Sequence, residues 1–415
     1  MLGLQELFDE QIKELFRPNK LGVRILENEL EKIGFFITKK QRTVFESQFS
    51  NIENDTLTFE FSDDQLNKAG FSSEEELKPK LEKIIKGLSS KVDKFANGID
   101  ETMQNLVESI TDAMAQSVLC TLEQRMDDMQ EDQEIIYNDF AENIQLVWGV
   151  PLGLLQGLIV ISDEVAQGYI TKYGDTQIDN IVQELLIRIH AKANQVAKEI
   201  LTLLKNGFSD GAQARWRTLH ELAVVCVFIS EHGEDVATRY INHEAVGTYK
   251  AAIQYNDYYI RLGATEISSE EIDSMQEEYL DLLAEYGQTY KNDYGWAAKA
   301  LNLKKPTFRD IEASVELDHH RPYYKLASAN VHANPSGVFN SLGLFPEEDI
   351  ILAGPSNLGL IHPAQSTIIS LNIITTTMLT YEANIDFIVI SKAMAEYGHK
   401  VENAFITVET NISKS

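Results

Sequence analysis

The sequence predicts an all-α protein: a large helical bundle preceded by an N-terminal helical arm with coiled-coil character. Apolar residues recur at helical spacing along most of the chain, and 44% of its 415 residues are hydrophobic, as in a globular protein. A clean two-residue alternation typical of a strand occurs near residues 56–62. Because 415 residues exceed one core, we expect two domains, residues 1–130 and residues 131–415, divided near the acidic run "MDDMQEDQE".

The N-terminal domain combines the short strand with a long helix. Leu57, Phe59 and Phe61 alternate with polar residues, which predicts the strand. From Leu81 a heptad repeat follows, on Ile85, Val92, Ile99, Leu106 and Ala113, with a companion seam on Leu81, Leu88 and Phe95. This repeat predicts a coiled coil and, through it, a homodimer. The alternative is one amphipathic helix packed on its own domain.

The second domain is predicted to be helical throughout. The stretch "VWGVPLGLLQGLIVI" and residues 181–204 indicate a buried helix and an amphipathic helix. Ser209 or Asp210 is expected to cap the helix that carries "RWRTLHEL", and a capped helix after Ser268 is expected to end at Gly287. A single long helix is expected from about Ala364 past residue 397.

Charge and cysteine content limit the partners and the compartment. With 64 acidic against 36 basic residues the net charge is −28, which argues against a membrane surface and against an extended nucleic-acid-binding face. A polyanion such as RNA would have to enter a local basic pocket. Cys120 and Cys226 are isolated, as in a reducing compartment. The start lacks the features of a signal peptide, and residues 353–381 are uncharged but too polar to span a membrane, so we expect a cytoplasmic protein.

The segment "RWRTLHEL", residues 215–222, concentrates polar groups at the entrance to an apolar helix. At 100° per residue, Trp216 and Leu219 share one face, while Arg217, His220 and Glu221 lie on the opposite face. The helix then becomes apolar all round, so other helices must enclose it. The polar cluster is therefore either a buried network or the wall of a cleft.

A second cluster, "ELDHHRPYYKLASANVHANPSG", follows a hundred residues later. On a helix that begins near residue 322, Lys325, Ser328 and His332 fall on one stripe, with Tyr324 beside it. Such groups bind phosphate or carboxylate and transfer protons. We expect a pocket shared with the first cluster, whose supporting residues are Arg217, Glu221, His319, Arg321, Tyr324, Lys325, Ser328 and His332.

Three separated motifs, "ARWRTLHELAVV", "NDYGWA" and "DHHRPYYKLASANVHANPSG", resemble a widespread bacterial helical family known as domain of unknown function 5677. The resemblance covers roughly residues 148–382 and implies a helical domain without an assigned activity. The motif residues that it shares with this chain are Arg215, Arg217, Glu221, Tyr324, Ser328 and His332.

A looser resemblance is to the HEPN ribonucleases, on the Arg-x4-6-His spacing of Arg215 and His220. It implies a dimeric, metal-independent endoribonuclease or toxin-type effector, in a setting such as antiphage defence. His220 would be the acid or base at the ribose 2′-hydroxyl, and Arg215 would offset phosphate charge.

Two alternatives stay open. The polar clusters could be structural, in a non-catalytic scaffold or partner-binding protein. Alternatively, Glu316-x-x-His319 and Glu396-x-x-His399 have the spacing of di-metal carboxylate bundles. We expect no metal, because about one such spacing occurs by chance in this composition and the two isolated cysteines do not suggest a zinc site. We expect no cofactor, because nucleotide-binding glycine motifs are not evident.

Overall fold

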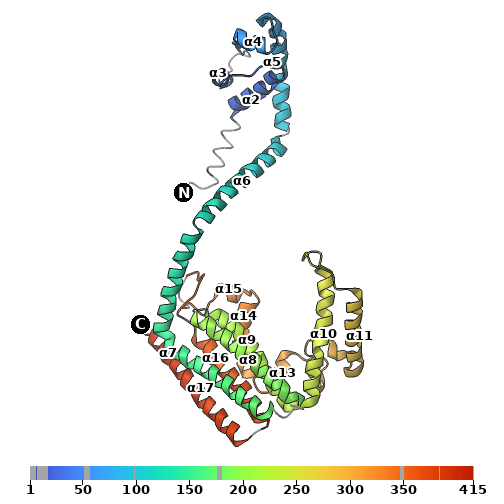
Figure 1. The fold of residues 1–415 in the computed structure, drawn as a ribbon, viewed down its shortest axis with the longest axis vertical. Helices are drawn as coiled ribbons and strands as arrows, with labels where there is room; N and C mark the ends of the chain where they lie inside the picture. Colours follow the sequence, from blue (N-terminus) through green and yellow to red (C-terminus); the bar gives the residue numbers. More distant parts are fainter. Residues whose placement is uncertain are drawn as a thin grey trace. The chain divides into compact units, whose positions relative to one another are not determined.

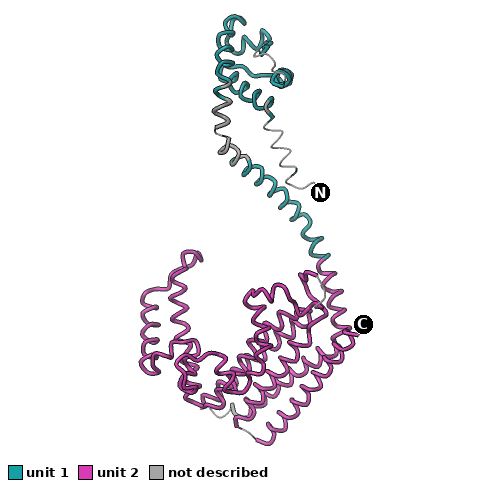
Figure 2. The backbone as a smooth tube through the Cα atoms, turned by 180° about the vertical axis from the view of Figure 1, so that it is seen from behind, with its two compact units in different colours: residues 1–132 teal, residues 133–415 magenta. Residues whose placement is uncertain are grey.

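The computed structural model describes Glu6 and residues 17–50, 57–97, 99–174, 180–345, 350–382 and 384–414. In these ranges every regular element is a helix, which confirms the all-α class (Figure 1). The chain divides into two compact units, Met1–Asp132 and Gln133–Ser415 (Figure 2). The boundary expected after residue 130 falls inside helix α7 (Met126–Gly174), not in a linker.

The first unit is a small helical domain built from α2 (Pro18–Glu31), α3 (Lys39–Ser50), α4 (Asp63–Lys68) and α5 (Glu74–Asn97), followed by α6 (Ile99–Gln124). Its core joins apolar side chains of α2 to those of α3, α4 and α5, including Leu26, Phe45 and Leu77. These side chains are almost fully buried. Burial of this amphipathic surface, more than helix propensity, holds such short helices together.

The predicted strand at residues 56–62 is wrong, because the described residues 57–62 form no strand. The Phe59 and Phe61 rings do enter the core, with ring centroids 5.3 Å from Phe45 and 4.7 Å from Phe35 respectively. Glutamine side chains take the place of a neighbouring strand.

The Gln48 side chain exchanges hydrogen bonds with the backbone N–H and C=O of Thr58. Gln41 donates to the carbonyl of Glu60 over 2.8 Å. The alternating pattern therefore predicted correctly that one face of this segment is buried, but it predicted wrongly that the segment pairs with another strand.

Some residues of the heptad repeat pack against the core of the first unit. Leu81 and Leu88, from the companion seam, pack against its core, as the single-domain alternative expects. Ala113 is exposed on α6. The side chains of Val92, Phe95, Ile99 and Leu106 lie outside the described part of the chain, so the coiled coil stays a prediction.

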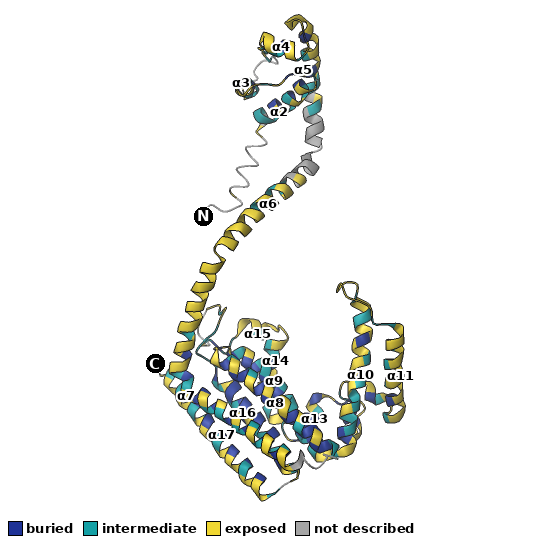
Figure 3. Cartoon of the chain, viewed as in Figure 1, coloured by how far each residue is buried: buried dark blue, intermediate teal, exposed yellow. Residues whose placement is uncertain are grey.

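The second unit is a bundle in which α7, α8 (Ile181–Lys205), α9 (Ser209–His232), α16 (Ile361–Tyr381) and α17 (Ile385–Ile412) lie side by side (Figure 1). Helices α10 (Glu234–Tyr258) and α11 (Ser269–Tyr286) form a hairpin at one end, with much exposed surface (Figure 3). The capping box of Ser268 and Glu271 starts α11 and Gly287 follows its end, as predicted.

The remaining elements are short, and two of them cover α9. They are the 3-10 turns Gln288–Lys291, Gly295–Ala297 (η2) and Asp318–His320 (η3), and the helices α12 (Ala298–Leu301), α13 (Phe308–Ser314), α14 (Arg321–Val331) and α15 (Pro335–Phe339). Helices α13 and α14 both contact α9. This placement brings the two polar clusters of the sequence together.

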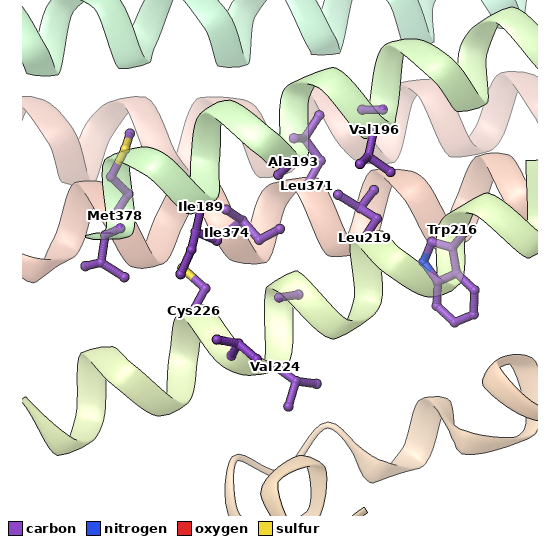
Figure 4. Packing of buried hydrophobic residues seen from close by; sticks show 14 of the residues in the cluster. Ile189, Ala193, Val196, Trp216, Leu219, Val224, Cys226, Leu371, Ile374 and Met378 are labelled. Carbon is purple, nitrogen blue, oxygen red and sulfur yellow. The ribbon is translucent and has the colours of Figure 1, made fainter. Parts of the chain in front are cut away.

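Figure 4 shows the centre of the bundle, where Leu219 of α9 lies beside Leu371 of α16, and Cys226 of α9 lies beside Ile374 of α16. All four side chains are fully buried. The long C-terminal helix expected from residue 364 is in fact two helices, α16 and α17. Asn384 caps the second by accepting a hydrogen bond from the N–H of Phe387, and this interruption lets α17 fold back along α16.

Within the described part of the chain, one helix, Met126–Lys172, is long and apolar enough to cross a membrane by length and composition alone. Only 39% of its most apolar window is buried inside the chain. Trp148, Leu152 and Leu155 on one face belong to the bundle core, whereas Leu146 and Val150 are 86% and 75% exposed.

Candidate functional site

The polar residues of "RWRTLHEL" lie where α9 enters the bundle, under α13 and α14. Trp216 anchors this turn, since it is buried and its indole N–H donates to Ser370 Oγ of α16 over 3.0 Å. The expected side-chain cap is not used, because Phe208 occupies the N-cap position. Asp210 instead accepts hydrogen bonds from Asn330 and from the backbone N–H of Leu342.

Arg215 faces α8. Its guanidinium forms an ion pair with Glu199 and donates to Thr218 Oγ1 over 3.3 Å. His220 faces α13 and α14 instead. The two residues of the expected catalytic pair are therefore engaged by different helices.

We define the inner cluster as His220, Glu312 and Arg321. His220 Nε2 lies 2.8 Å from Glu312 Oε1, and Arg321 Nη1 donates to Glu312 Oε2 over 2.8 Å. The side chains of His220 and Glu312 are only 2% and 0% exposed. These contacts join α9, α13 and α14 through one buried carboxylate.

The protonation of the inner cluster follows from its burial. Burial lowers the pKa of His220 to about 4, so its imidazole is neutral near pH 7 and donates from Nε2. Burial also raises the pKa of Glu312, and the charge and hydrogen bond of Arg321 oppose this rise. The Glu312 carboxylate is thus bound by one neutral donor, His220, and one permanent cation, Arg321. These two partners compensate the cost of burying its charge.

We define the outer cluster as Arg217, Glu221, Tyr324 and His332. Arg217 Nε lies 3.2 Å from Glu221 Oε1, and the Tyr324 hydroxyl donates to the same oxygen. Arg217 Nη1 lies 3.2 Å from His332 Nε2, an arrangement in which the guanidinium donates and the imidazole accepts. The guanidinium also stacks over the Tyr324 ring at 4.9 Å.

The outer cluster reaches the surface, whereas in the inner cluster only Arg321 is partly exposed, at 27%, and His220 and Glu312 are buried. The side chains of Arg217 and Glu221 are 26% and 35% exposed, and His332 is exposed. Tyr324 links the two layers, because its ring lies between them and the Arg321 guanidinium is 5.1 Å from its centroid. Burial, followed by the bond to Glu221, raises the pKa of its hydroxyl.

The other predicted residues lie at the margin of the two clusters. Ser328 Oγ donates to the backbone carbonyl of Tyr324 one turn earlier, which is a local helical role. Lys325 is exposed on α14. His319 is also exposed, and its ring lies 4.0 Å from that of His320.

The sequence analysis missed Glu312, although a signal was present. Phe308, Ile311 and Glu312 of α13 and Val315 directly after it form one buried stripe, so an acid stands within an apolar face. It also missed His190, buried in the core beside Ser162 and Thr375, with Nε2–oxygen distances of 3.0 and 3.1 Å.

A small pocket adjoins the outer cluster. It holds about 210 Å³ and is lined by Thr218, Glu221, Leu222, Val225, Tyr240, Tyr294, Trp296 and Phe308. Four of these residues are aromatic, and Glu221 belongs both to this pocket and to the outer cluster. Across the described residues, no group of three His, Cys, Asp or Glu side chains is placed to hold a metal ion, so neither Glu-x-x-His motif gains support.

Sequence comparisons cover the helices that carry both clusters. No curated protein and no solved structure gives a significant match. A family model does match, over a narrower range than the 148–382 expected, and this range holds every residue of the inner and outer clusters. Residues 183–349 match the model of a family of unknown function, DUF5677.

Proposed function

We propose that the outer cluster is the active site of a metal-independent endoribonuclease, with His332 as the acid–base group and Arg217 as the phosphate-binding group. The observation that carries the proposal is the 3.2 Å approach of Arg217 Nη1 to His332 Nε2 at the surface. The catalytic roles expected for Arg215 and His220 are therefore assigned to Arg217 and His332. His220 is too buried to meet a phosphodiester, and Glu199 engages Arg215.

The chemistry follows from the two side chains. An RNA phosphate would draw the Arg217 donors onto its oxygens, since a guanidinium binds phosphate through paired N–H groups. This frees His332 Nε2 to take the proton of the ribose 2′-hydroxyl. The 2′-oxygen then bonds to phosphorus, the bond to the 5′-oxygen breaks, and that oxygen takes a proton from solvent. The products are a 2′,3′-cyclic phosphate and a 5′-hydroxyl.

The other residues support this pair. Glu221 and Tyr324 hold the Arg217 side chain in place through an ion pair and a ring contact. The inner cluster fixes α14 against α9, so His220 is a positioning residue. Because the whole chain carries a charge of −28, RNA would have to approach through local basic side chains, of which Lys325 and His319 are exposed in the segment that leads to His332.

The test is cleavage of total RNA and tRNA by the purified chain with EDTA present. His332→Ala should lower the rate about 100-fold or more, as expected for loss of an acid–base group. The matched control is His399→Ala, which removes a histidine 69% exposed on α17 and should leave the rate unchanged. Cyclic-phosphate ends should appear only with active protein.

The result that would overturn the proposal is equal cleavage by wild type and His332→Ala, or intact RNA with wild type across neutral pH. His220→Ala separates the two histidines. If it abolishes cleavage while the variant stays folded and His332→Ala remains active, the original assignment to His220 is the correct one.

A second candidate, a non-catalytic scaffold in the cytoplasm that forms a homodimer, is favoured by a different observation. On α6, Leu119 and Leu122 are 46% and 44% exposed, at the three-residue spacing of a coiled-coil seam. If this seam pairs two copies, sedimentation should show a dimer that Leu119→Asp with Leu122→Asp converts to a monomer. A monomeric wild-type chain would contradict this.

A further inference from the structure

We propose that the pocket beside the outer cluster binds a nucleobase that carries an exocyclic amino group, such as cytosine. This inference rests on the proposed function, because it takes the phosphate of the same nucleotide to lie at Arg217. It adds what that proposal leaves open, namely which part of the RNA the protein recognises and by which residues.

The walls of the pocket suit a flat ring. Tyr240 and Trp296 meet edge to face with centroids 5.0 Å apart, and Tyr294 and Phe308 lie 6.2 Å apart. Leu222 and Val225 of α9 close the apolar side. Aromatic side chains of this kind stack on bases in proteins that bind single-stranded RNA. The volume of about 210 Å³ suits a single base better than a larger ligand.

One carboxylate oxygen of Glu221, Oε2, determines which base the pocket prefers. Tyr324 and Arg217 both engage Glu221 Oε1. Among the described residues no donor contacts Oε2, so this oxygen can accept a hydrogen bond from a ligand. A carboxylate accepts from the amino group of cytosine, whereas uracil presents a carbonyl at the same position and would be repelled. Glu221 thereby couples base recognition to Arg217, the phosphate-binding group.

The test compares the binding of cytidine monophosphate, uridine monophosphate and ribose 5-phosphate to the full chain by calorimetry. The two nucleotides differ at position 4, which is an amino group in cytosine and a carbonyl in uracil, and at N3, which carries a hydrogen only in uracil; the sugar phosphate lacks a base. We expect cytidine monophosphate to bind about tenfold or more tightly than ribose 5-phosphate, the gain typical of one stacked base. It should also bind more tightly than uridine monophosphate.

Two variants assign the effect to this pocket. Val225→Phe fills the cavity and should reduce the affinity for cytidine monophosphate to that for ribose 5-phosphate. The matched control is Val227→Phe, on the same helix but outside the pocket lining, and it should leave the preference intact. Glu221→Gln supplies an amide that can also donate, so it should bring the cytidine and uridine affinities together.

The outcomes separate this inference from the proposed function. Base-selective binding without RNA cleavage would support the pocket and contradict the nuclease. If cleavage depends on His332 but the three ligands bind alike, or if Val225→Phe keeps the cytidine preference, the nucleobase pocket is overturned.

Discussion

Removal of the His220 imidazole should destabilise the second unit strongly, whether or not the protein is an enzyme. In His220→Ala, the Glu312 carboxylate, which is 0% exposed, loses one of its two hydrogen-bond donors and keeps only Arg321. A hydrogen bond to a buried charge contributes about 1.5–3 kcal/mol. The lost imidazole also leaves a cavity beside Trp216, whose ring centroid lies 5.2 Å away. Breaking one partner of such a buried network costs about 3–5 kcal/mol.

The assay is urea unfolding followed by tryptophan fluorescence. Trp148, Trp216 and Trp296 all belong to the second unit, so the signal reports this unit alone in a chain with two. The variant should lower the unfolding free energy of the second unit by about 3–5 kcal/mol at neutral pH.

The double variant His220→Leu with Glu312→Leu tests the reason for that loss. It removes the buried carboxylate together with its donor, and apolar replacements of buried charged groups are often neutral or stabilising. We therefore expect it to be more stable than His220→Ala by at least about 1 kcal/mol. The reasoning is refuted if His220→Ala costs less than about 1 kcal/mol, or if the double variant is the less stable of the two.

Three further predictions concern other sites. Burial lowers the pKa of His190 from 6.5 to about 4, so the unfolded chain binds more protons and stability should fall as the pH drops from 6.5 towards 4. In His190→Leu, urea unfolding at both pH values should show a smaller fall; an equal fall would assign it to other groups. Arg215→Ala should cost less than about 1 kcal/mol in the same assay and leave RNA cleavage unchanged, because its partly exposed ion pair with Glu199 is weak. Complete loss of RNA cleavage in a folded Arg215→Ala variant would instead support Arg215 and His220 as the catalytic pair. Gly295→Ala should lower the thermal midpoint by several degrees, because the added Cβ would lie 2.3 Å from the backbone oxygen of Tyr290. An unchanged midpoint would show that this turn can relax.

The local sequence pattern was enough to predict the helices and to predict which side of each helix is buried. The period of apolar residues placed Trp216 and Leu219 in the core, and both are buried. The Ser268 capping box and the glycine after α11 are where the sequence indicates. These features depend on neighbours within about one helical turn, so they can be read without the fold.

Prediction from the local pattern failed where another segment of the chain supplied the hydrogen-bonding or packing partner. Leu57, Phe59 and Phe61 alternate like a strand, but the side chains of Gln48 and Gln41 bond their backbone. Alternation specifies which side is buried, not what satisfies the peptide groups. The break between α16 and α17 was also missed; Asn384 caps α17 there, and α17 packs back along α16.

The sequence by itself determined which residue types could form a site: two clusters rich in Arg, His and Tyr, a hundred residues apart. Only the tertiary structure decided which of them meet. It placed Glu312 under His220, turned Arg215 towards α8, and brought His332 to Arg217. Helical periodicity fixes the direction of a side chain on its own helix. The partner and the exposure of that side chain depend on how α8, α13 and α14 pack around α9, which is set by burial over the whole unit.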